Sequence, residues 1–163
     1  MHSVIAVYVE NKYGVLTRVS GMFMRKGFNI DSLAVGETDD PKFSRMTITL
    51  NGDDYAREQL INQLKKLHNV KQVKLLNQDS SVERELMLVK VKNTPENRNE
   101  IMAAAEIYRA KIIDYTTDTM CVEVTGEPNK IDAFIKVMKP LGIIEMCRTG
   151  VVALERGSSI MEK

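Results

Sequence analysis

The sequence predicts an α+β fold in which one order of strands and helices occurs twice along the chain. Short β-branched runs with alternating apolar residues are typical of strands, and apolar residues that recur every three or four positions between them are typical of helices. A polar break at residues 77–81 separates two stretches with this pattern. The chain has 163 residues, which is enough for two small domains with separate cores.

The first stretch contains four predicted strands and two predicted helices in the order β-α-β-β-α-β. Each helix has one apolar face, and Gly27 provides the stop signal of the first helix. The predicted strands are 4–10, 28–36, 43–50 and 70–76, and the helices lie between Gly14 and Gly27 and over 56–67. This order within about 75 residues is the split βαβ arrangement of a ferredoxin-like module, with an antiparallel sheet and helices on one face.

The second stretch repeats the order, so the prediction is two tandem ferredoxin-like βαββαβ modules. Its first helix is predicted to begin at residues 94–96, with Pro95 at the first helical position, and Gly150 is predicted to bend the chain near its end. The predicted strands are 85–91, 112–116, 120–124, 143–148 and 151–154, and the second helix begins at 126–129. The predicted domains are 1–77 and 84–157, with a linker at 78–83 and a loose tail at 158–163.

Composition excludes several classes of protein. Lys and Arg number 23 against 22 Asp and Glu, which gives no reason to expect nucleic acid or an anionic membrane as a partner. No apolar run approaches the ~20 residues that cross a bilayer, and no signal peptide is visible, so the expected location is the cytoplasm. Cys121 and Cys147 are expected to be small buried hydrophobic residues, with a disulfide as the alternative.

Catalytic and metal sites are also not predicted. His2 and His68 are far apart and neither has a cysteine at ligand spacing, so no metal site is expected. The glycines do not form a phosphate loop, and the paired aspartates lie at turns or helix caps. With an aromatic content of 6%, the strands do not offer the stacking surface that RNA-binding sheets use.

One constellation in the first module suits a ligand. Asn11 follows the first predicted strand, and Gly14 opens the first helix, whose free N–H groups and partial positive charge suit a carboxylate. Asn11 and Asn29 can each donate and accept hydrogen bonds, so they suit a small zwitterion better than a phosphate. The alternative is a purely structural turn, because Asn-x-x-Gly is common loop chemistry.

We expect the end of the first strand and the start of the second to lie on the same side of the sheet. Unpaired edge strands and small cores favour a homodimer, in which Asn29 of one chain would face residues 11–14 of the other. The ligand's carboxylate would meet N–H groups at the helix start, its ammonium the amide oxygens, and its side chain an apolar wall. The predicted site residues are Asn11, Gly14, Val15, Leu16, Asn29 and Ile30.

The second module is not predicted to bind this ligand. Its corresponding loop, residues 92–96, lacks the glycine and has Pro95 where an N–H donor would be needed. The effector site is therefore expected in the first module alone, and its completion by a second chain would link ligand binding to quaternary structure.

These motifs resemble a known family. The first module resembles an ACT domain, and nearly the whole chain resembles the small regulatory subunit of acetolactate synthase, also called acetohydroxyacid synthase. The stretches that carry the resemblance are Asn11-x-x-Gly14-Val15-Leu16-x-Arg18-Val19, Gly27-Phe28-Asn29-Ile30-x-Ser32-Leu33, Ser44–Ile48, Glu83–Val91, Ile112–Asp114, Lys130–Phe134 and Arg148–Gly157.

The resemblance implies a non-catalytic subunit in branched-chain amino acid biosynthesis, the route to valine, leucine and isoleucine. Such subunits activate a large catalytic subunit that holds thiamine diphosphate, magnesium and FAD, and no cofactor is expected in this chain. They also confer feedback inhibition by valine bound at the ACT dimer interface, and the six predicted site residues occupy the matching positions. The alternative is a free-standing ACT-type amino-acid sensor that acts on another regulator.

Overall fold

The computed structural model describes residues 2–162, which cluster into two compact units. One unit runs to Val82 and also takes in the segment from Val151 onward, and the other spans Glu83–Gly150. The predicted first domain and tail include Met1 and Lys163, which lie outside the described residues.

The first unit has the predicted β-α-β-β-α-β order. Its elements are β1 (His2–Glu10), α1 (Val15–Arg25), β2 (Ile30–Glu37), β3 (Phe43–Asn51), α2 (Asp54–Leu64) and β4 (Val70–Leu76). The strands form an antiparallel sheet in the order β2-β3-β1-β4, so β2 and β4 are its edges. The short 3-10 helix η1 (Gln78–Ser80) leads into the long strand β5 (Ser81–Lys92).

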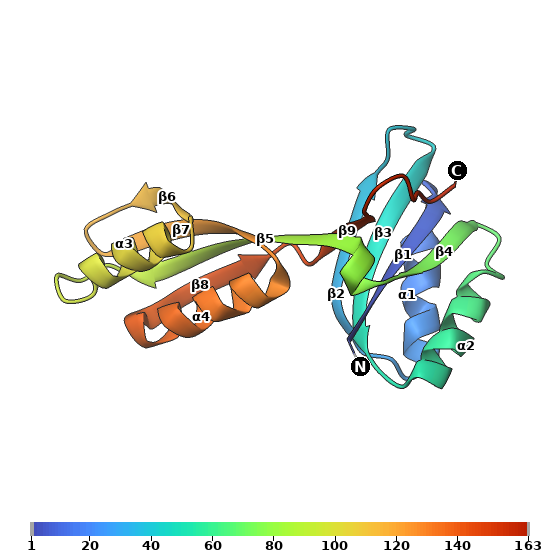
Figure 1. The fold of residues 1–163 in the computed structure, drawn as a ribbon, viewed down its shortest axis with the longest axis horizontal. Coiled ribbons are helices and arrows are strands. Elements are labelled where there is room, and N and C mark those ends of the chain that lie inside the picture. Colours follow the sequence, from blue (N-terminus) through green and yellow to red (C-terminus); the bar gives the residue numbers. More distant parts are fainter. Residues whose placement is uncertain (1, 163) are drawn as a thin grey trace. The chain divides into compact units, whose positions relative to one another are not determined.

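The central strand β1 carries apolar side chains on both faces of the sheet, and both faces are covered. Ser3 through Val9 are all buried, as expected for a continuous apolar run rather than an alternating one. On one face, α1 and α2 pack Phe23, Leu60 and Leu64 against Ile5 (Figure 1). On the other face, Val4 packs with residues of the C-terminal segment.

The C-terminal segment follows the second unit along the chain but packs with the first unit in space. The predicted second domain extends to residue 157, and within it the segment from Val151 clusters with the first unit. It contains the short strand β9 (Val152–Glu155), which pairs with β5. Ala153 and Met161 pack on Val4 and Ala6, so this segment removes from water an apolar surface that β1 would otherwise expose.

The second unit repeats the same topology. Its elements are β5, α3 (Arg98–Ile107), β6 (Lys111–Tyr115), β7 (Thr119–Gly126), α4 (Pro128–Gly142) and β8 (Ile143–Arg148). The sheet order is β6-β7-β5-β8, and α3 and α4 cover one face of it (Figure 1). Strand β5 alternates strictly, with Met87, Val89 and Val91 in the core. The predicted α+β class with two tandem ferredoxin-like modules is confirmed.

The predicted start of α3 is wrong. The helix begins at Arg98, and Pro95 lies in the turn before it rather than at the first helical position. The side chain of Asn97 stabilises this turn, since its Oδ1 accepts from the N–H of Thr94 at 2.8 Å and its Nδ2 donates to Lys92 O at 3.0 Å. The helix starts only after this side chain has satisfied the turn's backbone groups.

The predicted burial of the cysteines is also wrong. Cys121 is half-buried and Cys147 is exposed, and both are free thiols. They lie opposite Lys90 and Leu88 of β5, whose side chains are on the sheet face away from the helices. The alternation of β7 buries Met120 and therefore turns its neighbour Cys121 outward.

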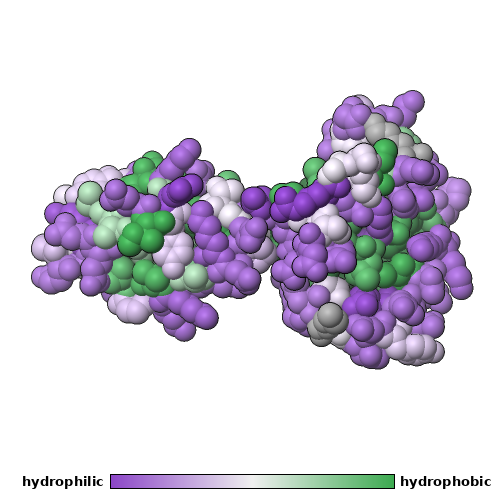
Figure 2. All heavy atoms as spheres, in the orientation of Figure 1, coloured by the Kyte–Doolittle hydropathy of each residue, from purple (hydrophilic) through white to green (hydrophobic). Residues whose placement is uncertain are grey.

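The surface of both units is mixed but mainly hydrophilic, as Figure 2 shows. On the unit of Glu83–Gly150, Figure 2 also shows a hydrophobic area over the region of α3 and α4. Large exposed apolar side chains of these two helices are Met102, Ile107 and Val137. Within the described residues, no helix has the length and apolar character needed to cross a bilayer.

Candidate functional site

The turn between β1 and α1 presents backbone donors. Gly14 is the N-cap of α1 and has a left-handed backbone with φ 79°, which favours glycine. The N–H of Val15 lies 3.4 Å from Lys12 O, whereas the N–H groups of Leu16 and Thr17 donate to no group within residues 2–162. No side chain caps this helix start, so these donors face outward and suit an anionic group.

The side chains that follow Gly14 have different positions. Val15 is buried in the core, so it can offer a ligand only its backbone. Leu16 is 45% exposed and can contact a ligand or a second chain directly. A shallow groove continues along the exposed side of α1, lined by Thr17, Arg18, Gly21, Met24 and Arg25.

Asn11 is held in one orientation. Its Nδ2 donates to Glu37 Oε1 and to Pro41 O, each at 3.0 Å. Both partners are acceptors, so the amide nitrogen must point toward them and the amide oxygen away. Asn11 Oδ1 has no hydrogen-bond donor within the described residues, and it is therefore oriented as an acceptor for a cationic group such as an ammonium.

Glu10 braces the start of the same loop. Its carboxylate forms ion pairs with Lys71 at 2.9 Å and Lys12 at 3.0 Å, and it accepts from Asn69 Nδ2 at 2.8 Å. These hydrogen bonds, led by that from Lys71, lower the pKa of Glu10 to about 2. Asn69 in turn accepts from Arg18 Nη1 at 2.7 Å, so β1, α1 and the start of β4 are joined beside the site.

Asn29 and Ile30 lie at the other end of the sheet, contrary to the expected placement. Strand β1 ends opposite Phe43, and Glu37 pairs with Ser44, whereas Ile30 pairs with Leu50. Because β1 and β2 both run antiparallel to β3, they point the same way, and the end of β1 and the start of β2 are at opposite ends of the sheet along the strand direction.

Within one chain, the predicted residues therefore form two groups. The eight residues of β2 separate them by roughly 25 Å at a rise of about 3.3 Å per residue. Asn29 is exposed and its side chain has no hydrogen-bond partner within residues 2–162. Ile30 is half-buried against the core. One group is Asn11, Gly14, Val15 and Leu16, and the other is Asn29 and Ile30.

The corresponding loop of the second unit is occupied by its own contacts. Asn93, at the end of β5, is buried, and its Nδ2 donates to Thr116 O at 2.6 Å. Its Oδ1 accepts from Arg98 Nε at 2.9 Å. Both ends of this amide are therefore used within the unit, unlike those of the Asn11 amide.

The sequence did not predict that two residues distant along the chain would orient Asn11. Glu37 and Pro41 orient Asn11 across 26 and 30 positions of the chain, and neither belongs to a local motif. The Thr38-Asp39-Asp40-Pro41 turn was visible as a turn, but its contact with Asn11 depends on the pairing of β1 with β3.

Two family descriptions match the chain in tandem. Residues 5–72 match the small subunit-like ACT domain of acetohydroxyacid synthase, and residues 84–157 match the small subunit of acetolactate synthase. The chain is thus a two-module protein whose first module is an ACT domain, as its fold and its strand–turn–helix site indicated.

Relatives match over nearly the whole chain. A probable acetolactate synthase small subunit of Archaeoglobus fulgidus is 51% identical over 97% of this chain and 99% of its own length. The small subunit of acetolactate synthase isozyme 3 of Escherichia coli is 44% identical over 99% of both chains. The crystal structure of the acetolactate synthase small subunit from Thermotoga maritima superimposes with a TM-score of 0.89 at 38% identity, covering 98% of this chain and 99% of that one. The chain belongs to the family of acetolactate synthase small subunits.

Proposed function

We propose that the chain is the regulatory subunit of an acetolactate synthase and binds valine between two ACT domains. In this role it activates a thiamine diphosphate-dependent catalytic subunit in the cytoplasm and makes it sensitive to feedback inhibition. Membership of the family supports the regulatory role. The observation that carries the effector site is the orientation of Asn11, whose amide oxygen is left as an acceptor three residues before the uncapped start of α1 at Gly14.

A homodimer through β2 would complete the site. Among the described residues, β2 is a sheet edge that pairs with β3 alone, and unpaired edges favour pairing with another chain. Antiparallel pairing of two β2 strands reverses the direction of the second strand. It would bring Asn29 of a second copy to the end where Glu37 and Asn11 lie, which the single chain cannot do.

The chemistry of this composite site suits an α-amino acid. The N–H groups of Leu16 and Thr17 would receive the carboxylate, and Asn11 Oδ1 with Asn29 of the second copy would receive the ammonium. The half-buried Ile30 would contact the aliphatic side chain. Valine is the proposed effector, and leucine and isoleucine are its competitors, because one methylene changes affinity by only ~1–3 kcal/mol.

The chemistry of the holoenzyme would belong to the catalytic partner. We propose that thiamine diphosphate, magnesium and FAD are bound there and that this chain contributes no catalytic residue. It would act through binding, because an effector that prefers one dimer geometry shifts the population of that geometry.

Reconstitution with the catalytic subunit tests this proposal. The acetolactate-forming subunit from the same organism is assayed alone, with this chain, and with this chain plus valine. We expect the chain to raise the rate and valine to lower it again. A rate and a valine response that are the same with and without the chain would reject the regulatory role.

Calorimetry separates the effector from the partner. Valine, leucine and isoleucine are titrated into the full chain, with alanine as a small-side-chain control. We expect valine to bind most tightly. Valine binding without any effect on the catalytic subunit would instead favour the alternative of a free-standing amino-acid sensor.

A further inference from the structure

The segment of residues 151–161, here called the C-terminal strap, lies across the outer face of the first sheet. It meets β2 where the N–H of Val151 donates to Ser32 Oγ at 3.3 Å, and β3 where Arg45 Nη2 donates to Ala153 O at 2.9 Å. Ala153 packs with residues of β1 and β4, namely Val4, Ala6 and Leu76. The strap thus touches every strand of the sheet.

Polar contacts fix the far end of the strap on β4. Lys74 forms an ion pair with Glu155 at 2.5 Å, and Ser159 Oγ donates to the same carboxylate at 2.9 Å. The N–H of Arg156 donates to Ser80 O at 2.8 Å. Val151 and Ala153 are 4% and 5% exposed, so the strap is packed as well as hydrogen-bonded.

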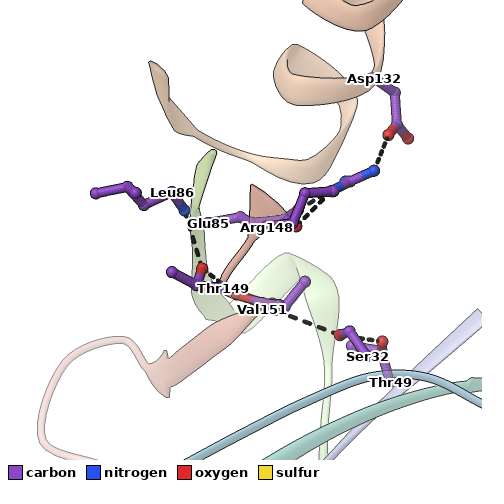
Figure 3. Close-up of polar contacts among 9 residues, drawn as sticks. Ser32, Thr49, Glu85, Leu86, Asp132, Arg148, Thr149 and Val151 are labelled. Atoms are coloured by element: carbon purple, nitrogen blue, oxygen red, sulfur yellow. Dashed lines mark hydrogen bonds and ion pairs between the residues drawn. The ribbon is translucent and has the colours of Figure 1, made fainter. Parts of the chain in front are cut away.

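Ser32 is the residue of β2 that the strap contacts. Its hydroxyl accepts from the N–H of Val151 and also lies 2.6 Å from Thr49 Oγ1 on β3, as Figure 3 shows. The register of β2 against β3 shifts between Ile30 and Ser32. The predicted site residues Asn29 and Ile30 come just before this irregularity, so Ser32 lies where the regular pairing of β2 begins.

We propose that the strap is a positioning element of the effector site, which it holds through Ser32. This inference rests on the proposed effector site and extends it to a third element besides the turn and the edge strand. A ligand that contacts Asn29 and Ile30 orders the start of β2, and an ordered β2 strengthens the Ser32–Val151 hydrogen bond. Effector binding and the attachment of the strap to β2 through the Ser32–Val151 hydrogen bond are therefore coupled, and the coupling is reciprocal.

Along the chain, the strap closely follows the last strand of the second unit. Only Thr149 and Gly150 separate it from β8 of the second unit. Within that unit, Thr149 is tied to β5, since the N–H of Leu86 donates to its Oγ1 at 3.1 Å and its own N–H donates to Leu86 O at 3.0 Å (Figure 3). Thr149, two positions before the start of the strap, is therefore fixed to the second sheet.

Hydrogen exchange without ligand tests the hold of the strap on β2. In the full chain, Ser32→Ala removes the shared hydroxyl, and we expect amides of β2 and of residues 151–156 to exchange about threefold to tenfold faster. Ser32→Thr keeps the hydroxyl and should restore slow exchange. Ser20→Ala is the matched control, because within the described residues the Ser20 hydroxyl on α1 bonds to Thr17 O alone. Unchanged exchange in Ser32→Ala would overturn the inference.

Exchange with valine tests the coupling to the effector. In the wild-type chain, saturating valine should slow exchange at Val151 and Ala153 as well as in β2. In Ser32→Ala, valine should still protect β2, bind about threefold to tenfold more weakly, and lose its effect on the strap.

The exchange experiments without and with valine distinguish a failure of the coupling from a failure of the effector site. Valine that binds the wild type and protects β2 but leaves the strap unchanged would overturn the coupling, while the effector site would stand. A wild-type chain that binds no branched-chain amino acid would overturn the effector site and with it the coupling. The exchange of Ser32→Ala without ligand would then still decide whether the strap holds β2.

Discussion

Asn11 and Glu37 are joined by a hydrogen bond of 3.0 Å between the end of β1 and the end of the edge strand β2. This contact, with a second from Asn11 to Pro41 O, uses both N–H donors of the amide. It leaves the amide oxygen oriented away from Glu37 and Pro41, three residues before the N-cap Gly14 of α1. In the proposed effector site, Asn11 would form one side, whereas Asn29, proposed for the other side, lies roughly 25 Å away in the same chain.

Replacement of Asn11 by alanine should weaken valine binding without unfolding the protein. The loss of a hydrogen bond to a charged ammonium is worth about 1.5–3 kcal/mol, which corresponds to roughly tenfold to a hundredfold in the dissociation constant. Calorimetry measures the affinity, and circular dichroism checks the fold. Asn99→Ala is the matched control, since Asn99 is exposed on α3. Equal loss of affinity in both variants would contradict the assigned site.

Mixed dimers should reveal whether the site is shared between chains. Asn11→Ala and Asn29→Ala each damage both sites of their own homodimer. A heterodimer of the two variants has one site with both changes and one intact site, so mixing should restore valine binding to part of the dimers. Titration of the mixed sample after subunit exchange measures the recovered sites. No recovery, despite exchange shown by mass spectrometry, would contradict a site shared between Asn11 of one chain and Asn29 of the other.

Gly14→Ala should destabilise the first unit, and Gly21→Ala should not. A Cβ on either residue would meet nothing within 4 Å, so space does not distinguish them. Gly14 has φ 79°, and its substitution costs about 1–2 kcal/mol because an L side chain is strained there. Gly21 lies inside α1, where alanine is favoured by about 1 kcal/mol. Urea unfolding of both variants gives the two free energies, and effects of the same sign would contradict the argument.

Acid should lower the stability of the first unit by protonating Glu10 at the end of β1. The pKa of Glu10 is lowered from 4.5 to about 2 by its hydrogen bonds with Lys71, Lys12 and Asn69. A lowered pKa in the folded state contributes stability above pH 4.5, and this contribution is lost as the pH falls from 4.5 toward 2. Unfolding free energies measured across that range should fall less steeply in Glu10→Gln than in the wild type. Parallel curves would show that Glu10 does not contribute.

Removal of Arg148 should strongly destabilise the second unit. Its guanidinium donates two hydrogen bonds to the buried Glu85 carboxylate, at 2.6 and 2.8 Å, and a further contact at 3.0 Å reaches Asp132 of α4 (Figure 3). Arg148→Met would leave a buried charge unpaired, at a cost of about 3–5 kcal/mol. The double variant with Glu85→Leu should recover most of that loss.

Arg84→Met provides the control for the same measurement. Arg84 and Glu127 form an exposed pair at 3.6 Å, whose loss should change stability by less than about 1 kcal/mol. Thermal unfolding of the single and double variants measures these differences. Similar losses for Arg84→Met and Arg148→Met would contradict the importance of burial.

Much of the fold could be predicted from local patterns. The alternation of β5 and the continuous apolar run of β1 are visible in the sequence and are explained by one-sided and two-sided burial. The sequence could not show what covers the second side of β1. The strap from Val151 does so, and the reason lies in contacts between residues about 150 positions apart, such as Val4 and Ala153.

Predictions from short sequence windows were wrong where the burial or the hydrogen bonds of a side chain depend on residues that are close in space. Pro95 looked like a helix start, but Asn97 organises the turn and α3 begins at Arg98. Cys147 looked like a small core residue, but the pairing of β8 with β5 places it on the outer face. Asn97 Nδ2 also donates to Leu141 O, 44 positions away, and neither this contact nor the strand pairing is encoded in a window of a few residues.

The sequence by itself determined the two tandem modules, the family, and the residues of the candidate site, because these follow from periodicity and from short motifs. The tertiary structure alone decided where those residues lie. The parallel course of β1 and β2 separates Asn11 from Asn29, the contact with Glu37 orients Asn11, and the strap reaches Ser32. Such relationships arise from strand order and long-range contacts, which no local pattern of residues specifies.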